Sequence, residues 1–483
     1  MLELQLLIGG QDRHASGART FDRIDPVTGA VATRSAAASI DDTNAAADAA
    51  AAAFPAWAAL SPTERRKRLN KAADLLDAKT PEFIRIGVAE TGAVPGWYGF
   101  NVTLAANILR EAAALTTQVA GEVIPSNVPD SLALAVRQPA GVVLGIAPWN
   151  APVILGVRAI AMPLACGNTV VLKASGLCPG VHRLIGSALQ DGGLGDGGGN
   201  VISKAPEDAA AIVEALIAHP KVRRVNFTGS TRVGRIIGRL SGEHLKPAVL
   251  ELGGKAPFVV LDDADLDVAV DAAGFGAFMN QGQICMSTER LVVDDAIAED
   301  FVARLARKAT SLVAGNPHAE GTVLGALVSV DAVQRCRELV DDAVSKGARL
   351  AAGGRYDGAI MQPTVLDGVT PEMRIYAEES FGAVVSVVRA RGEEDAVRIA
   401  NDTEYGLSSA VFSRDVSRAW RVAARLETGI CHINGPTVHD EAQMPFGGTK
   451  ASGYGRFGGK AGIHEFTELR WITVQNGPRH YPI

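Results

Sequence analysis

Short apolar segments alternate with helix-like segments between about residues 141 and 252. The apolar segments predict strands at 141–146, 168–172, 200–202, 222–227 and 248–252. The segments between them predict helices at 153–165, 181–190, 207–218 and 231–240. Because the strands are continuously apolar, they are typical of a parallel sheet covered on both faces. A ligand site, most simply for a nucleotide, is expected at the carboxyl ends of such strands.

Helical patterns also precede this region. The run Ser61-Pro62-Thr63-Glu64 predicts a capping box with proline at the first helical position. The residues behind it form an apolar helical stripe, made of Leu69, Ala72, Ala73 and Leu76. Further helices are predicted over 41–60 and 97–119, and we expect these helices to cover a sheet.

A second series of strands and helices begins at about residue 253. It predicts strands at 257–261 and 291–293, and helices at 265–279, 295–312 and 330–346. The tail after residue 466 reads as a strand. Glycine and proline near 120–140 indicate that the chain leaves one domain there and then returns to it.

One stretch is long enough to cross a bilayer without a charge, residues 138–157. It contains Pro139, Pro148 and Pro152, and Arg158 follows it. A strand, a turn and the start of a helix explain this pattern better than a membrane span. The first residues also lack the basic region of a signal peptide.

Composition narrows the class of protein. The chain has 483 residues, with 47 Lys and Arg against 53 Asp and Glu, which gives a net charge of −6. At about 150 residues per domain, this length predicts roughly three domains. A hydrophobic fraction of 47% argues against disorder, and the acidic balance provides no basic field for nucleic acid or anionic lipid. Five cysteines without a CxxC motif argue against a disulfide scaffold or a structural zinc site and favour a reduced, cytoplasmic chain.

Cys285 is the cysteine most suited to chemistry. It follows a predicted helix in the run Asn280-Gln281-Gly282-Gln283-Ile284-Cys285, where Gly282 lets the backbone turn away. Catalytic groups are often held on such loops. The alternative is a buried structural thiol, which is the commoner fate of a free cysteine.

Two polar residues end predicted parallel strands. Glu251 is followed by two glycines, and a carboxylate on an apolar strand end should have a raised pKa that suits a general base. The alternative is a salt-bridged or capping carboxylate. The Asn150 amide suits an oxyanion hole, and its alternative is to cap the helix that begins near residue 153.

A glycine-containing turn joins a strand to a helix at Phe227-Thr228-Gly229-Ser230-Thr231-Arg232-Val233-Gly234. Free N–H groups at a helix N-terminus bind phosphate, and glycine allows close approach. The spacing matches neither the dinucleotide fingerprint nor a P-loop, so the motif alone is weak. The nine histidines do not cluster, and we expect no metal site.

Six segments together resemble the aldehyde dehydrogenase superfamily over essentially the whole chain. They are Pro148-Trp149-Asn150, Phe227-Thr228-Gly229-Ser230, Glu251-Leu252-Gly253-Gly254-Lys255, Gly282-Gln283-Ile284-Cys285, Glu378-Glu379-Ser380-Phe381-Gly382 and the run from Pro445 to Arg456. The residues around Cys285 and those from Asn226 to Gly234 are most similar to the aromatic aldehyde (salicylaldehyde and vanillin) dehydrogenases.

The resemblance implies an α/β fold in three parts. A Rossmann-type dinucleotide-binding domain would comprise residues 1–122 and 143–250. A catalytic α/β domain would comprise 251–465, and a β-arm for oligomerisation would comprise 123–142 and 466–483. A homodimer or homotetramer is expected, with no nucleic-acid or membrane partner.

The resemblance also implies roles for individual residues. The catalytic set would be Cys285 as nucleophile, Glu251 as general base and Asn150 as an oxyanion donor beside the Cys285 backbone N–H. The cofactor would contact Ile146, Trp149, Lys173, Gly229, Ser230, Val233, Gly234, Leu252, Glu379 and Phe381. The substrate tunnel would be lined by Trp97, Arg158, Ile284, Met286 and Phe446.

The implied reaction is the oxidation of an aldehyde to a carboxylic acid through a thiohemiacetal and a thioester on Cys285. NAD is the expected cofactor. Relatives that prefer NAD often carry Glu three residues after the lysine, but here Gly176 occupies that place. Gly176 cannot repel a 2′-phosphate, so we expect weak discrimination against NADP.

The predicted substrate is a hydroxylated aromatic aldehyde. Trp97 and Phe446 offer flat faces for a ring, and Arg158 could pair with a phenolic or carboxyl oxygen. The alternatives are an ion-paired structural role for Arg158 and an aliphatic or semialdehyde substrate. A cysteine acyltransferase or hydrolase without redox chemistry, or a structural protein that kept the fold, would be a different class.

Overall fold

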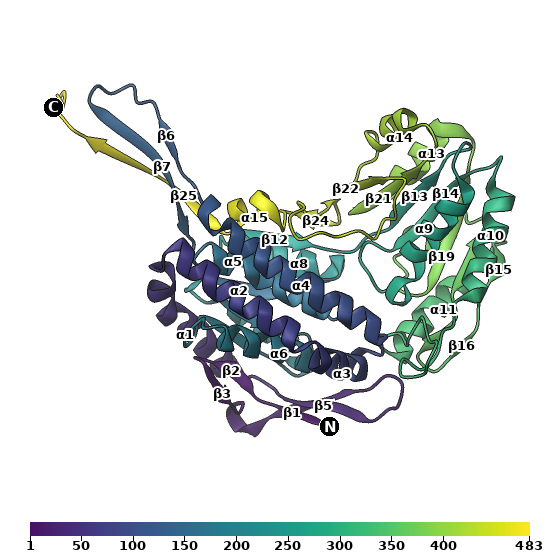
Figure 1. Cartoon of the computed structure of the whole chain (residues 1–483), viewed down its shortest axis with the longest axis horizontal. Helices are drawn as coiled ribbons and strands as arrows, with labels where there is room; N and C mark the ends of the chain where they lie inside the picture. Colours follow the sequence, from purple (N-terminus) through teal and green to yellow (C-terminus); the bar gives the residue numbers. More distant parts are fainter.

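The computed structural model describes all 483 residues, and two large sheets form its two halves (Figure 1). The first sheet has eight strands. In spatial order they are β24 (Gly453–Tyr454), β12 (Ala248–Glu251), β11 (Val222–Thr228), β8 (Val142–Ile146), β9 (Thr169–Lys173), β10 (Gly199–Ile202), β2 (Leu6–Ile8) and β3 (Gln11–Arg13). The five strands from β12 to β10 run parallel, as their continuous apolar runs predict.

Helices cover both faces of this sheet. One face carries α5 (Pro152–Ala165) and α6 (Pro179–Asp191), with α2 (Pro62–Ala78), α3 (Thr80–Thr91) and α4 (Pro95–Leu115) outside them. The other face carries α1 (Ile40–Ala58), α7 (Ala209–Ala218) and α8 (Thr231–Glu243). Along β8, Val143 faces the first layer while Val142 and Leu144 face the second, so alternate side chains fill two separate cores.

The second sheet has seven strands. In spatial order they are β15 (Arg349–Ala352), β18 (Thr364–Asp367), β19 (Val384–Ala390), β14 (Thr288–Asp294), β13 (Ala256–Val260), β21 (Ser408–Phe412) and β22 (Ile430–Ile433). All neighbours run parallel except β15 and β18. Its helices are α9 (Leu266–Phe278), α10 (Ala298–Ser311), α11 (Val330–Ser345), α12 (Arg374–Ala377), α13 (Gly392–Asn401) and α14 (Val416–Ala423).

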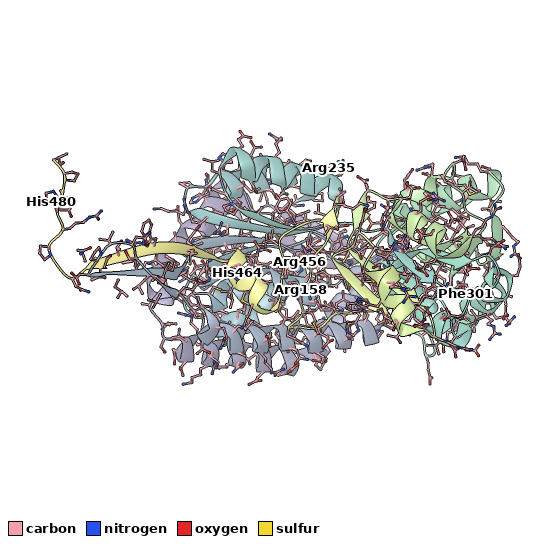
Figure 2. The ribbon with its side chains drawn as sticks, turned by 90° about the horizontal axis from the view of Figure 1, so that it is seen from above. Arg158, Arg235, Phe301, Arg456, His464 and His480 are labelled. Atoms are coloured by element: carbon pink, nitrogen blue, oxygen red, sulfur yellow. The ribbon has the colours of Figure 1, made fainter.

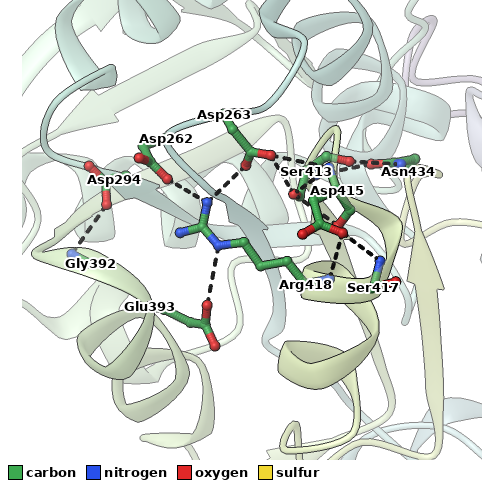
Figure 3. A network of polar contacts seen from close by, with 10 residues as sticks. All are labelled: Asp262, Asp263, Asp294, Gly392, Glu393, Ser413, Asp415, Ser417, Arg418 and Asn434. Carbon is green, nitrogen blue, oxygen red and sulfur yellow. Dashed lines mark hydrogen bonds and ion pairs between the residues drawn. The ribbon is translucent and has the colours of Figure 1, made fainter.

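An arginine on α14 ties three parts of this second half together (Figure 3). The Arg418 guanidinium donates to Asp262 at 2.7 Å and to Asp263 at 3.1 Å, both just after β13. It also donates to Glu393 of α13 at 3.2 Å. Several charges on one fork-shaped group hold two helices against the sheet more firmly than isolated surface pairs would.

A three-stranded antiparallel arm projects from the first half and carries the C-terminus near its tip (Figure 1). It consists of β6 (Glu122–Ile124), β7 (Ser131–Pro139) and β25 (Thr467–Gln475), and α15 (Gly459–Glu465) precedes β25. Smaller sheets are formed by β1 (Leu2–Leu4), β5 (Val31–Ala36) and β4 (Thr20–Ile24), by β16 (Tyr356–Asp357) with β17 (Ile360–Met361), and by β20 (Tyr405–Gly406) with β23 (Thr449–Lys450). Four 3₁₀ turns complete the chain, η1 (Ser16–Ala18), η2 (Thr116–Gln118), η3 (Pro206–Asp208) and η4 (Met279–Gly282).

The predicted helix ends are partly wrong. Ser61 accepts from the Glu64 N–H at 3.2 Å, but the Glu64 carboxylate pairs with Arg68 rather than closing a capping box. A complete capping box occurs instead at the start of α1, between Ser39 and Asp42. The helix predicted over 97–119 begins at Pro95 and ends at Leu115.

The uncharged stretch at 138–157 forms the end of β7, then β8, a turn and the first half of α5, which confirms the sequence interpretation. No helix of the chain combines the length and apolar character that crossing a bilayer would need. The division into domains stays a prediction. β24 pairs antiparallel with β12 and so extends the first sheet from a segment close to the C-terminal arm.

Candidate active site

Three neighbouring parallel strands bring the first polar groups together. β8 leads into Trp149 and Asn150, β11 leads into Gly229 and Ser230, and β12 ends on Glu251. The register sets Thr228 of β11 opposite Glu251, so these ends lie at one edge of the sheet. The polar groups at these strand ends therefore lie at the edge where the sequence pattern predicts a ligand site.

The cysteine reaches the same edge from the second half of the chain. α9 ends at Phe278, and η4 turns the backbone sharply before Cys285. Asn280 and Gln281 have φ of 49° and 56°, a left-handed region that side chains rarely adopt. At Gly282, which also has positive φ, a Cβ would lie 2.1 Å from the Gly382 carbonyl oxygen, so only glycine fits. Strained backbone of this kind commonly aims a functional group.

Asn280 links the cysteine loop to the Asn150 loop. Its side-chain amide donates to the Asn150 carbonyl oxygen at 3.0 Å. The Trp97 indole N–H donates to the same oxygen, also at 3.0 Å. These two bonds fix the Asn150 backbone, while the Asn150 side-chain amide forms no hydrogen bond within the protein. Asn280 is a positioning residue that sequence reasoning did not single out.

A cavity of about 260 Å³ opens at this strand edge. It is lined by Pro148, Trp149, Asn150, Thr228, Gly229, Ser230, Glu251, Leu252, Gly253, Cys285, Arg335, Glu379 and Phe381. All three predicted catalytic residues are among them. The structure also brings six predicted cofactor residues to this cavity, whereas Ile146, Lys173, Val233 and Gly234 do not line it.

A second cavity, of about 440 Å³, meets the first at Asn150 and Cys285. Twelve of its seventeen lining residues are hydrophobic, so it suits an apolar ring. It contains all five predicted substrate residues, Trp97, Arg158, Ile284, Met286 and Phe446. Seen from above, Arg158 lies near the middle of the molecule, far from the arm tip at His480 (Figure 2).

Arg158 does not face the second cavity as a free charge. It forms an ion pair with Asp440 at 2.6 Å, and its guanidinium lies 4.4 Å from the Phe446 ring centre. The side chains of Arg158 and Asp440 are only 6% and 9% exposed. Arg158 therefore forms the structural ion pair that the sequence offered as an alternative, and it also lines the second cavity.

Glu251 is a buried carboxyl group whose two oxygens have no hydrogen-bond partner of normal geometry. Burial raises the pKa of Glu251 to about 7, which confirms the expected direction. Burial also raises the pKa of the Cys285 thiol well above its usual value, and the negative charge of Glu251 adds to the rise. The two groups are therefore close, and a proton acceptor stands beside the thiol.

Asn150 does not cap α5. The N-cap residue is Ala151, and no side chain accepts a bond there, so the alternative role for Asn150 is wrong. Ser230 is the N-cap of α8, and its hydroxyl accepts from the Val233 N–H at 3.4 Å. The first N–H groups of this thirteen-residue helix lie next to the first cavity, where an anion would be favoured.

A buried ion pair fixes the backbone of the loop that carries Glu379 and Phe381. The Lys255 ammonium donates to Glu289 at 2.8 Å, and Glu289 accepts from the Ser380 and Phe381 backbone N–H groups at 3.0 Å. Phe381 then meets Trp149 edge to face at 5.7 Å. Burial raises the pKa of Glu379 to about 7. The sequence did not predict the roles of Lys255 and Glu289, nor the place of Arg335 in the cavity wall.

The remaining cysteines lie apart from this site. Cys166, Cys178 and Cys336 are buried, and Cys431 is exposed. None of the four lines either cavity. No group of three or more His, Cys, Asp and Glu side chains is arranged to hold a metal ion.

The profile described as "Aldehyde dehydrogenase family" matches residues 13–472. A vanillin dehydrogenase of Pseudomonas sp. (strain HR199 / DSM 7063) is 67% identical over 483 residues, which is 100% of both chains. A crystal structure of a salicylaldehyde dehydrogenase from Pseudomonas putida G7 complexed with salicylaldehyde is 49% identical, with a TM-score of 0.98 and 100% of both chains covered. A betaine aldehyde dehydrogenase from Staphylococcus aureus in complex with NAD⁺ is 31% identical, with a TM-score of 0.95 over 100% of this chain and 97% of that one.

Proposed function

The chain belongs to the aldehyde dehydrogenase family, and from this premise we propose that it oxidises aromatic aldehydes to carboxylic acids. One observation carries the proposal. Cys285 and Asn150 line both a polar cavity at the strand edge and an apolar cavity large enough for a ring. A similar vanillin dehydrogenase and a similar salicylaldehyde-bound structure support an aromatic substrate.

The polar cavity has the features that a nicotinamide dinucleotide requires. The N-terminus of α8 at Ser230 suits a pyrophosphate, and the Glu379 carboxylate, which accepts from the Gly254 N–H at 3.0 Å, suits a ribose hydroxyl. Lys173 would bind the adenosine ribose. Phe381 and Trp149 offer aromatic surface beside Cys285. When bound, the nicotinamide supplies the acceptor for the hydride that leaves the substrate carbon.

The protein's own groups would carry the remaining steps. Glu251 removes the thiol proton, and the Cys285 sulfur attacks the aldehyde carbon to give a thiohemiacetal. Two donors are free to hold the oxyanion, because the Asn150 side-chain amide and the Cys285 backbone N–H make no hydrogen bond within the protein. After oxidation, a thioester remains on Cys285. Glu251, after passing the thiol proton to solvent, takes a proton from water, and the resulting hydroxide attacks the thioester carbonyl. The acid is released, and the leaving Cys285 sulfur regains a proton.

A substrate panel tests this function. We expect reduced nicotinamide to form when NAD and benzaldehyde, vanillin or salicylaldehyde are mixed with the protein, and kcat/KM to be highest for an aromatic aldehyde. A higher kcat/KM for a medium-chain aliphatic aldehyde or a semialdehyde would refute the aromatic preference. Ester or thioester hydrolysis without any reduced cofactor would instead identify a cysteine hydrolase or acyltransferase.

Cofactor choice is the next prediction, and it rests on Gly176. We propose that NAD is preferred but that NADP is also used. A Cβ at Gly176 would lie 3.7 Å from the Lys204 ammonium, which forms no ion pair or hydrogen bond within the protein. Burial and, to a smaller extent, the positive charge of Lys204 lower the pKa of Lys173 to about 7, so two amines lie near this position.

We expect Gly176→Glu to lower kcat/KM for NADP by at least about tenfold relative to NAD, because a carboxylate would repel the 2′-phosphate and pair with Lys204. The position has ordinary backbone angles and room for a side chain. Gly176→Gln is the matched control, since it adds the same length without charge. Wild-type kcat/KM values that differ by several hundredfold between the cofactors would contradict weak discrimination.

The arm is the proposed oligomer contact. β6 and most of β25 are exposed, and three large apolar side chains of the arm face solvent: Trp471, Leu469 and Val123 are 76%, 60% and 70% exposed. A three-stranded sheet with this much exposed apolar surface gains little stability alone, so we propose that it packs on a second copy in a homodimer or homotetramer.

We expect Trp471→Asp to shift the protein towards smaller species in light scattering at equal concentration. Trp420→Asp on α14 is the matched control, because Trp420 is 69% exposed but lies outside the arm. A wild-type protein that is monomeric at micromolar concentration would refute the proposed role of the arm.

A further inference from the structure

The apolar cavity contains few polar groups, and most of them are already engaged. The Trp97 indole N–H donates to the Asn150 carbonyl oxygen. Arg158 donates to Oδ2 of Asp440 at 2.6 Å, and His439 Nε2 lies 2.9 Å from a Glu441 carboxylate oxygen. Asn150 and Cys285 face the reacting carbon. Oδ1 of Asp440, like the Nε and Nη1 atoms of Arg158, has no hydrogen-bond partner within the protein.

Oδ1 of Asp440 is buried and has no hydrogen-bond partner. The whole side chain is 9% exposed, in a residue that lines the cavity. A buried acceptor without a donor is unfavourable, so such an atom in a cavity wall commonly has its partner in the ligand. A ligand group that donates a hydrogen bond would satisfy it.

The charge of the wall also restricts the ligand. Asp440 neutralises Arg158, whose guanidinium in turn stacks on Phe446 at 4.4 Å. A carboxylate on the substrate would lie beside the negative Asp440 and beside an Arg158 whose charge Asp440 already neutralises. A neutral hydroxyl can donate to Oδ1 without disturbing the ion pair, and a hydrogen bond to a carboxylate is stronger than one between neutral groups.

We propose that Asp440 is a specificity-determining residue that accepts a hydrogen bond at Oδ1 from a ring hydroxyl of the aromatic aldehyde. The inference rests on the proposed function and adds the substrate class to it. Asp440 would then favour hydroxybenzaldehydes over benzaldehyde, over the corresponding methyl ethers and over carboxybenzaldehydes. Arg158 then acts as a positioning residue that orients Asp440, rather than as the anchor of a substrate anion.

Wild-type kinetics give the first test. We expect at least one of the 2-, 3- and 4-hydroxybenzaldehydes to exceed both benzaldehyde and its own methyl ether by about tenfold in kcat/KM, which corresponds to about 1.4 kcal/mol. The kcat/KM for 4-carboxybenzaldehyde should be lower than that for benzaldehyde. If no hydroxyl isomer shows an advantage over its methyl ether, the proposal is overturned whether or not any variant folds.

Asp440→Asn gives the second test. An Asn oxygen that accepts from Arg158 would turn its NH₂ towards the ring hydroxyl, and the reverse orientation would point NH₂ at the guanidinium. We therefore expect the ratio of kcat/KM for the hydroxybenzaldehyde to that for its methyl ether to fall below about threefold. The relative rate for 4-carboxybenzaldehyde should rise as Arg158 loses its partner.

Glu441→Gln is the matched control. It makes the same change of acid to amide at the next residue, which is 43% exposed and does not line the cavity. This variant should keep the wild-type hydroxyl advantage. An advantage that survives Asp440→Asn would overturn the assignment to Asp440. Failure of the wild type to oxidise benzaldehyde or any other aromatic aldehyde would instead refute the proposed function on which the inference rests.

Discussion

Cys285→Ala is expected to lower aldehyde turnover by about 10⁴-fold or more, because no other group can form the thioester. Dinucleotide binding should be nearly unchanged, since the substitution removes one sulfur from a cavity bounded by thirteen residues. The measurement pairs steady-state rates with binding of NAD followed by fluorescence quenching. The pairing separates loss of the nucleophile from loss of the fold.

The matched control for this variant is Cys431→Ala. Cys431 lies on β22 and is exposed, and it lines neither cavity. The Cys431→Ala variant should retain wild-type activity. More than a few per cent of wild-type turnover in Cys285→Ala would exclude Cys285 as the nucleophile.

Glu251→Gln is the second large effect. A positioned general base contributes about 10²–10⁴-fold, so steady-state turnover should fall within that range. Gln keeps the size of the side chain but can accept a proton from neither the thiol nor water. Both steps should slow, and hydrolysis should slow more, because water is a far weaker acid than a thiol and needs the base more. A rapid-mixing experiment should then show a burst of about one reduced cofactor per subunit before the slow phase.

The pH profile provides the control for this role. Burial raises the pKa of Glu251 to about 7, so the group is largely protonated below that pH and is a carboxylate above it. In the wild type, the hydrolysis rate should rise as pH increases through about 7 and then level off. In Glu251→Gln this rise should be absent. An identical profile in both proteins would assign the titration to another group.

The strand ends of the active site could be predicted because they depend on local patterns. Continuous apolar runs identified β8, β11 and β12, and parallel strands bring Asn150, Ser230 and Glu251 to one edge. The reactive thiol could be placed only on a loop, since nothing local shows that Cys285 crosses from the second half to meet Glu251. The proximity of Cys285 to Glu251, and the aromatic residues of the second cavity, were predicted only from the resemblance to a family.

The sequence assigned no role to Asp440, Lys255, Glu289 or Asn280, and these residues act through long-range contacts or loop geometry. Arg158 and Asp440 are 282 positions apart, and Lys255 and Glu289 are 34 apart, so no periodic pattern links them. Asn280 acts through a positive φ that only the folded loop reveals. The N-terminal strands β1, β2 and β3 have three residues each, too few to show a period, and were not predicted.

The central claim is that the aldehyde is carried as a thioester on Cys285 and released by Glu251. Mass spectrometry of Glu251→Gln, quenched during turnover with an aromatic aldehyde and NAD, tests it most directly. We expect the intact subunit to gain the mass of one acyl group, located on the peptide that contains Cys285. Reduced cofactor formed without any adduct, or an adduct on a different cysteine, would contradict the account.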